Sequence, residues 1–179
     1  NNVNLHMVFL GNPGTGKTTV ARLISDILYD LKYIKQNKLV EVSSKDLVAE
    51  YVGQTAVKTM NVVEKAMGGI LFIDEAYALC PDDNDTFGKE AVNTLVQEIE
   101  NHRDALMVII AGYSSDMDAF LTKNQGLRSR FPKEIIFEDY EPEELCEIFK
   151  LTVKNKGYVL NTKLDAEIMA LLKKESAKT

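Results

Sequence analysis

Residues 11–18, Gly-Asn-Pro-Gly-Thr-Gly-Lys-Thr, have the composition and spacing of a phosphate-binding loop. They lie between the apolar run 7–10 and a helix-like run that ends at residue 31. Main-chain N–H groups and the positive end of the helix would surround the phosphates of a nucleoside triphosphate. We expect the Lys17 ammonium to reach the β- and γ-phosphates and the Thr18 hydroxyl to hold Mg²⁺. The predicted nucleotide contacts in this loop are Asn12, Pro13, Gly14, Thr15, Gly16, Lys17, Thr18 and Thr19.

A second chemical group, Asp74 and Glu75, follows the four apolar residues 70–73. Such a run is typical of a central parallel strand that is buried on both faces. Open α/β sheets bind ligands at the carboxyl ends of their strands, so Asp74 is expected to hold Mg²⁺ through water. Glu75 is expected to polarise the water that attacks the γ-phosphate, which favours hydrolysis over transfer to a second small substrate. The alternative is that both acids cap the following helix.

The composition indicates one sizeable core plus a small appendage in a cytoplasmic enzyme. The chain has 179 residues and a formal charge of −6, which argues against a broad nucleic-acid interface. No apolar run is long enough to cross a bilayer, so we expect no membrane contact. Cys80 and Cys146 are far apart in sequence and suggest neither a disulfide framework nor a zinc cluster, and His6 and His102 lack metal-site spacing.

Strand-like and helix-like patterns alternate along the chain, which predicts a parallel sheet with helices on both faces and right-handed crossovers. The expected strands are residues 6–10, 39–42, 70–73, 106–111 and 133–137. The expected helices are residues 18–31, a short one that Ser43 or Ser44 caps and that ends at 49, one that ends before Gly68, 88–100 and 116–121. The helix before Gly68 is expected to bury Val57, Met60, Val63 and Met67, which recur at helical spacing.

The character of the sequence changes after Phe137. Residues 138–142 form a polar hinge, and two helical stripes follow that Gly157 separates. We therefore expect a nucleotide-binding α/β domain at 1–140 and the start of a helical lid domain at 141–179. Two helices alone cannot bury both of their apolar stripes, so this lid is expected to be incomplete.

The motifs GNPGTGKT, ILFIDEA and GLRSRF, together with the helical appendage, resemble an AAA+ ATPase module over nearly the whole chain. More narrowly, residues 50–59, 111–113 and 126–131 are similar to the group that contains the rubisco-activase-like CbbX proteins and stage V sporulation protein K. The resemblance implies a P-loop NTPase fold: a five-stranded parallel sheet of order 5-1-4-3-2, sandwiched by helices, with a truncated α-helical lid. It also implies a homo-oligomer, a hexameric ring with nucleotide at the subunit boundaries.

The same resemblance assigns roles to two further segments. Arg130, or as second choice Arg128, occupies the place of the arginine finger that a neighbouring subunit inserts toward the γ-phosphate. The alternative is that both arginines pair with surface acids. Residues Tyr51, Val52 and Gly53 match the pore loop that grips an extended polypeptide, and the alternative is a surface tyrosine in a turn.

One position departs from the AAA+ pattern. The polar residue that orients the attacking water, often Asn, would fall at Tyr113, with Ser114 just beyond, and the sequence does not decide between them. The lid arginine and the adenine-contacting linker of the family are expected to lie outside residues 1–179. We therefore expect weak nucleotide affinity and slow turnover for this segment alone.

These expectations together describe a Mg²⁺-dependent ATPase whose hydrolysis of ATP remodels or threads a protein client in a ring. Two alternatives remain, an ATP-binding switch or assembly module with little hydrolysis, and a DNA-directed AAA+ motor. A GTPase would read guanine through the Thr-Lys-Leu-Asp match at residues 162–165, but this match follows no strand and Asp165 suits a helix N-cap. A small-molecule kinase needs neither a finger from a neighbour nor a pore loop.

Overall fold

The computed structural model describes residues 4–12, 15–137 and 147. The chain divides into two compact units, residues 1–136 and residues 137–179. Several predicted features lie outside the described residues: Pro13 and Gly14 of the phosphate loop, the hinge after Phe137, the expected lid helices and the 162–165 match. The domain boundary at 140/141 therefore stays a prediction.

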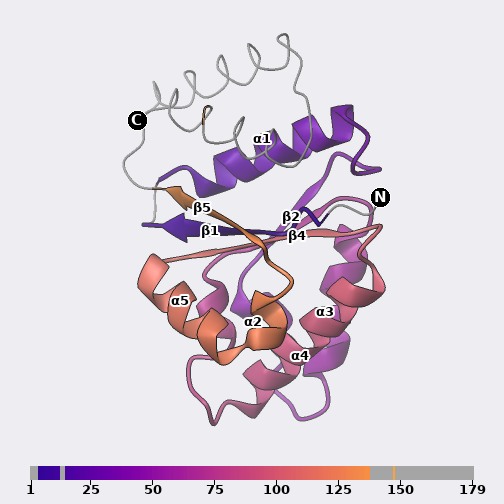
Figure 1. Ribbon diagram of the computed structural model, residues 1–179. Coiled ribbons are helices and arrows are strands. Elements are labelled where there is room, and N and C mark those ends of the chain that lie inside the picture. The colour runs from indigo at the N-terminus through magenta and orange to yellow at the C-terminus, as the bar shows by residue number, and fades with distance from the viewer. Residues whose placement is uncertain (1–3, 13–14, 138–146, 148–179) are drawn as a thin grey trace. The chain divides into compact units, whose positions relative to one another are not determined.

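Five strands form one sheet of order β2-β3-β4-β1-β5, which is the order expected from the resemblance, read from the other edge (Figure 1). The pairs β1–β4, β3–β4 and β2–β3 are parallel. Every residue of β1, β3 and β4 is buried, as their unbroken apolar sequences predict. The strands are β1 (Met7–Gly11), β2 (Leu39–Val42), β3 (Ile70–Ile73), β4 (Met107–Gly112) and β5 (Lys133–Phe137).

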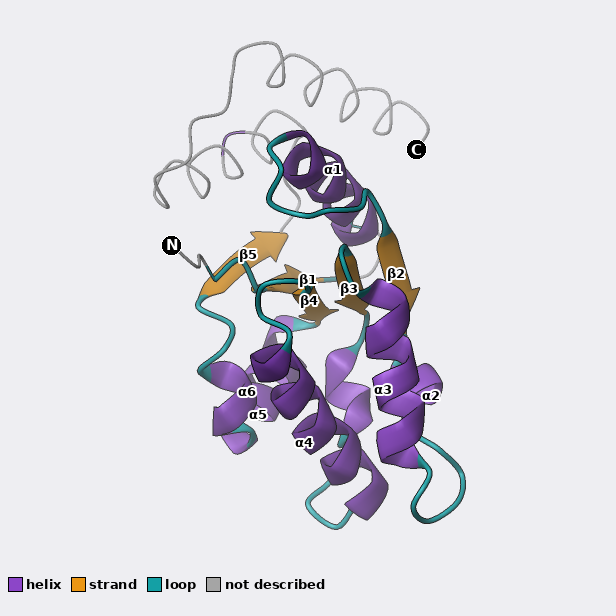
Figure 2. Ribbon diagram, turned by 90° about the vertical axis from the view of Figure 1, so that its right-hand side faces the viewer, coloured by secondary structure: helices purple, strands orange, loops and turns teal. Residues whose placement is uncertain are grey.

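Helices cover both faces of the sheet, which confirms the predicted sandwich (Figure 2). Helix α1 (Lys17–Asp30) lies on one face, and the other helices among the described residues lie on the opposite face. That second layer and the sheet enclose an apolar core that includes Leu71, Leu95 and Ile110. Its helices are α2 (Ser44–Leu47), α3 (Thr55–Ala66), α4 (Thr86–Asn101), α5 (Ser114–Lys123) and α6 (Gln125–Arg128), with the 3₁₀ helix η1 (Ala76–Leu79). No helix in the described ranges has the length and apolarity needed to cross a bilayer.

The buried face of α3 differs in part from the predicted one, since Val63 is buried and Met67 is partly buried as expected. Val57 and Met60 are exposed, whereas Thr55 and Thr59 are buried. The Thr59 hydroxyl donates to the Leu47 carbonyl at 2.9 Å, and the Thr55 hydroxyl accepts the Ala49 N–H at 3.1 Å. Because each threonine has a main-chain partner at or just beyond the end of α2, burial costs these hydroxyls little, and the helix turns its two larger apolar side chains outward.

Candidate active site

Of the predicted site residues, Lys17, Thr18, Asp74 and Glu75 converge on one pocket at the carboxyl edge of the sheet. Its volume is about 260 Å³. Three chain segments form it: the start of α1, the residues after β3 and the residues after β4. Because neighbouring strands run parallel, their carboxyl ends meet there. The lining residues are Gly16, Lys17, Thr18, Thr19, Asp74, Glu75, Gly112 and Tyr113.

The described part of the phosphate loop turns tightly into α1. Gly16 caps the helix with φ 89°, a backbone conformation that favours glycine. The Lys17 ammonium donates to the carbonyls of Gly11 at 2.5 Å and Asn12 at 3.4 Å, so the side chain folds back over its own loop. The Thr15 hydroxyl also donates to the Asn12 carbonyl, at 2.7 Å. Partial burial lowers the pKa of Lys17, and the charges of Asp74 and Glu75 oppose this shift.

Glu75 has an unusual backbone conformation for a residue with a side chain. Its φ of 49° and ψ of 47° are left-handed. Its N–H donates to an Asp74 carboxylate oxygen at 3.0 Å. Glu75 directly precedes η1, but its side chain makes no capping hydrogen bond there. The capping role considered from the sequence therefore does not account for Glu75, and its exposed carboxylate faces the pocket that holds Lys17.

The donors in this pocket suit a magnesium ion that keeps most of its waters. Thr18 supplies a hydroxyl and Asp74 a carboxylate, and both line the same pocket. Mg²⁺ prefers such oxygen ligands and takes few of them from protein. In the described ranges no group of three or more His, Cys, Asp or Glu side chains forms a denser cage.

Two tyrosines meet beside Lys17. The Lys17 Nζ lies 6.0 Å from the centroid of the Tyr113 ring, which is within the range of a cation–π contact. The Tyr113 ring lies 6.4 Å from that of Tyr77 in η1. Burial raises the pKa of Tyr77, and the nearby charge of Glu75 adds to this shift. Tyr77 belongs to no motif and is not among the predicted site residues, whereas Tyr113 is expected at this edge and Ser114 begins α5.

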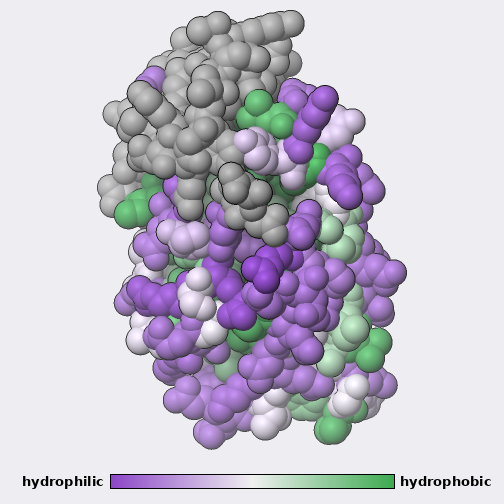
Figure 3. Space-filling view, turned by 45° about the vertical axis from the view of Figure 1, so that its right-hand side comes forward, coloured by the Kyte–Doolittle hydropathy of each residue, from purple (hydrophilic) through white to green (hydrophobic). Residues whose placement is uncertain are grey.

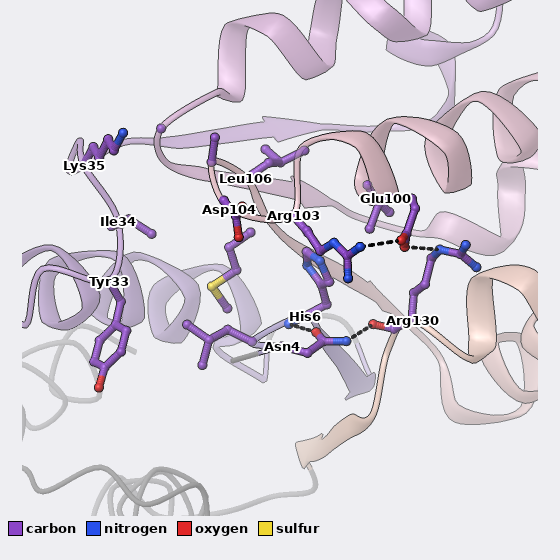
Figure 4. A pocket seen from close by; sticks show the side chains of 15 residues that line it. Asn4, His6, Tyr33, Ile34, Lys35, Glu100, Arg103, Asp104, Leu106 and Arg130 are labelled. Carbon is purple, nitrogen blue, oxygen red and sulfur yellow. Dashed lines mark hydrogen bonds and ion pairs between the residues drawn. The ribbon is translucent and has the colours of Figure 1, made fainter. Parts of the chain in front are cut away.

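Neither predicted arginine finger lies in this pocket. Arg130 lines a second cavity of about 340 Å³, together with His6, Gly68 and Leu106, which precede β1, β3 and β4 (Figure 4). That cavity is therefore at the amino edge of the sheet. Strands of four to six residues at about 3.3 Å each separate the two edges by roughly 13–20 Å. The side chain of Arg130 is too short to cover that distance.

The two arginines also differ in how they are held. The Arg130 Nη1 donates to the Gly126 carbonyl at 2.7 Å, and the Arg130 side chain is 28% exposed. The Arg128 side chain is 43% exposed and lies 3.2 Å from the Thr122 hydroxyl and 3.7 Å from Asp118. Each arginine thus has an acid within 4 Å, Asp118 for Arg128 and Glu100 for Arg130, so the alternative of pairing with surface acids fits both of them.

The segment Tyr51–Gly53 is a protruding turn just before α3. Tyr51 is 67% exposed and Val52 is 89% exposed. Gly53 has φ 81°, so the turn depends on glycine. On the face drawn in Figure 3 the described surface is largely hydrophilic with small hydrophobic patches. None of its residues lines the nucleotide pocket, so the turn is free to contact another molecule.

Sequence comparison confirms the resemblance drawn from the motifs. A family model described as ATPase family associated with various cellular activities (AAA) matches residues 7–139. The ESX-1 secretion system protein EccA1 of Mycobacterium tuberculosis is 58% identical over 80% of this chain and 26% of its own length. The chloroplastic ribulose bisphosphate carboxylase/oxygenase activase of Cyanidioschyzon merolae is 52% identical over 88% of this chain and 54% of its own length.

Stage V sporulation protein K of Bacillus subtilis is 49% identical over 88% of this chain and 49% of its own length. The chain thus spans between about a quarter and about half of these relatives. A solved structure, the FIGL-1 AAA domain in complex with ADP, matches 92% of this chain and 54% of that chain with a TM-score of 0.53 and 20% identity. This structural likeness supports the fold alone.

Proposed function

Because this chain belongs to the AAA family of ATPases, we propose that it hydrolyses ATP with Mg²⁺ in a ring of identical subunits and uses the energy to remodel or thread a protein client. The observation that carries the proposal is the convergence of Lys17, Thr18, Asp74 and Glu75 on one pocket. A binding-only switch would have no need of a carboxylate placed like that of Glu75.

Each side chain of the pocket has a distinct task in this proposal. Loop N–H groups and Lys17 bind the phosphates and neutralise the charge that builds up on them. Thr18 and Asp74 would hold a magnesium ion, which would supply positive charge that neutralises the phosphates. Glu75 accepts a hydrogen bond from the attacking water and orients it toward the γ-phosphate. Tyr113 borders the same space and keeps its ring beside Lys17.

The arginine finger must come from a neighbouring subunit. Arg130 is separated from its own phosphate loop by the length of the sheet, so its guanidinium can act only on a nucleotide bound to the next copy. A planar, permanently charged donor there stabilises the transferred phosphoryl group. The site of one chain is therefore incomplete by itself, which supports a closed ring of subunits in head-to-tail contact.

The exposed turn at Tyr51 is the candidate contact with a client. A tyrosine ring offers a large contact area and has few rotatable bonds to immobilise, so it can grip many sequences. The names of the relatives include a rubisco activase and a secretion system component, which supports a protein client without identifying it. We also propose that the protein works in the cytoplasm, as the composition suggests.

The substitution Glu75→Gln tests the hydrolytic role. It removes the charge that polarises water and leaves the shape of the pocket unchanged. We expect ATP binding to persist, oligomers to become more stable, and the hydrolysis rate to fall by about 10²-fold or more. Phosphate release and nucleotide binding by calorimetry measure these effects on the full-length protein. An unchanged rate would remove Glu75 from the mechanism.

Mixing two inactive variants tests the finger. Glu75→Gln subunits keep Arg130 but cannot hydrolyse, and Arg130→Ala subunits keep Glu75 but lack the finger. If the finger acts between subunits, the mixture regains ATPase activity that neither variant has alone. Arg128→Ala in place of Arg130→Ala is the matched comparison, and complementation only with that variant would transfer the role to Arg128. No gain with either arginine variant would refute a site shared between subunits.

A further inference from the structure

The carboxylate of Glu100, in the last turn of α4, lies between two arginines (Figure 4). One Glu100 oxygen lies 3.1 Å from Nη2 of Arg103, and the other lies 3.6 Å from Nε of Arg130. Nε of Arg130 is buried and has no hydrogen-bond partner in the described part of the chain, so the Glu100 carboxylate is its nearest charge complement there.

Three segments fix the position of Arg130. The Gly126 carbonyl accepts from Nη1 at 2.7 Å, and Glu100 attracts the Nε side of the guanidinium. The Asn4 side-chain amide donates to the main-chain carbonyl of Arg130 at 3.1 Å. The next residue, Phe131, packs its ring 5.6 Å from that of His6. Nη2 makes no hydrogen bond or ion pair with the described residues and is the nitrogen that remains for an outside acceptor.

We propose that Glu100 is a positioning residue for Arg130: it holds the guanidinium so that Nη2 points away from its own subunit toward the nucleotide of the next one. The inference rests on the proposed role of Arg130 between subunits. A flexible arginine would sample many rotamers, and only a fraction of them would reach the phosphate. The ion pair restricts the planar group to one orientation, and Arg103 keeps the Glu100 carboxylate from turning away.

This arrangement predicts that Glu100 matters in the subunit that supplies the finger and not in the subunit that hydrolyses. The mixing experiment can separate the two, because each partner can carry Glu100→Gln independently. In the donor position it is combined with Glu75→Gln, and in the acceptor position with Arg130→Ala. We expect the donor combination to lower the recovered kcat by about 10-fold with little change in KM, because misorientation affects the transition state more than ATP binding.

The matched control is Glu98→Gln, the same change two residues earlier on α4. Glu98 contacts His102 at 3.1 Å and forms no ion pair with Arg130 in the described part of the chain, so its replacement should leave kcat unchanged in either position. Arg103→Gln in the donor should give a smaller loss than Glu100→Gln, since it removes only the support of the carboxylate. Thermal unfolding should change little for all three, because these pairs are partly exposed.

The outcomes distinguish failure of the inference from failure of the proposed function. If the Glu75→Gln and Arg130→Ala mixture recovers no activity, the role of Arg130 between subunits fails first. If the mixture recovers activity, the effect of Glu100→Gln decides the inference. Equal losses in donor and acceptor, or no loss in the donor, would show that Glu100 does not position the finger. A donor-specific loss that Glu98→Gln does not reproduce supports the proposal.

Discussion

At the scale of single residues, the active site stores backbone strain at Glu75. Left-handed φ and ψ cost a residue with a Cβ roughly 1–2 kcal/mol relative to the right-handed region, and glycine avoids this cost. Glycine also raises the entropy of the unfolded chain, which offsets roughly 0.4–1 kcal/mol. We therefore expect Glu75→Gly to raise the free energy of unfolding by roughly 0.5–1 kcal/mol and to abolish hydrolysis. Urea denaturation and phosphate release measure the two effects.

Lys32 offers a matched control for this strain. It is the other residue with a side chain that has positive φ in the described ranges, at 65°, and it is exposed at the end of α1. Lys32→Gly should stabilise the fold by a similar amount and leave ATPase activity unchanged. If Glu75→Gly destabilises the protein while Lys32→Gly stabilises it, interactions of the Glu75 side chain outweigh the strain.

His6 should make stability depend on pH. Burial lowers its pKa from 6.5 to about 4, and its Nδ1 accepts the Val108 N–H at 3.0 Å, so the folded state favours the neutral ring. Between pH 6.5 and 4 the unfolded chain binds the proton and the folded chain does not, so stability falls as the pH is lowered through this window. The shift corresponds to about 3 kcal/mol, and the loss is complete below pH 4.

His6→Asn keeps an acceptor near Val108 and cannot be protonated. Its free energy of unfolding should be lower at pH 7.5, because the smaller side chain leaves space beside Phe131. It should, however, fall less than that of the original protein between pH 6.5 and 4. Denaturant titrations at pH 7.5, 6, 5 and 4 give the free energy of unfolding of each protein. If this free energy falls equally with pH in both proteins, His6 is not neutral and buried as described.

At the scale of elements, a close approach of α4 to η1 constrains the segment that follows Glu75. A Cβ on Gly88 would lie 2.0 Å from the Leu79 carbonyl oxygen and 2.9 Å from the Cα of Cys80. Gly88→Ala must therefore push η1 away from α4, and η1 begins directly after Glu75. We expect a loss of roughly 2–3 kcal/mol in stability and a fall in ATPase activity of the molecules that remain folded.

Gly126→Ala provides the comparison, because a Cβ there meets only Val96 methyl groups at 3.8 and 4.0 Å. Its stability should be unchanged or raised by up to about 1 kcal/mol, since alanine favours the helix. Circular dichroism melts and single-turnover hydrolysis compare the two variants. If Gly88→Ala and Gly126→Ala have equal stability and equal hydrolysis rates, the packing of Gly88 against η1 does not limit either property.

The same scale explains how much of the fold could be predicted. Strands 39–42, 70–73 and 133–137 were predicted with their observed bounds, because each is a short β-forming run between residues that break structure. The sheet order came from the family resemblance and not from periodicity. Helices η1 and α6 were not predicted, since four residues are too few to show a helical period. The prediction for α3 was wrong at Val57 and Met60. The buried threonines have main-chain partners that only the folded chain brings near them.

The site was predictable to the extent that topology determines it. Parallel strands bring their carboxyl ends together, so Lys17 and Asp74 had to lie near each other once the sheet was known. The contact of Tyr77 with Tyr113 and the contact of Glu100 with Arg130 join residues 36 and 30 positions apart in sequence. No pattern within one helix or strand indicates such pairs, and their geometry came only from the structure.

At the scale of the whole molecule, the proposed mechanism divides one reaction between the two edges of the sheet. The candidate phosphate pocket is at the carboxyl edge and Arg130 is at the amino edge, so in this proposal an isolated chain holds both parts of the site but cannot combine them. ATPase activity per subunit should therefore rise with protein concentration and level off once rings are complete. ATP binding needs only one edge and should depend much less on concentration.

Arg130→Ala should remove this concentration dependence, because neighbours then add nothing to the site. Its rate per subunit should stay near that of the dilute original protein, roughly 10³-fold below the plateau if the finger contributes as in other phosphoryl-transfer enzymes. Hydrolysis rates over a hundredfold range of concentration, with mass photometry at each point, relate rate to assembly. A rate per subunit that stays constant while rings form would show that each chain completes its own site, and would refute the proposed role of Arg130 between subunits.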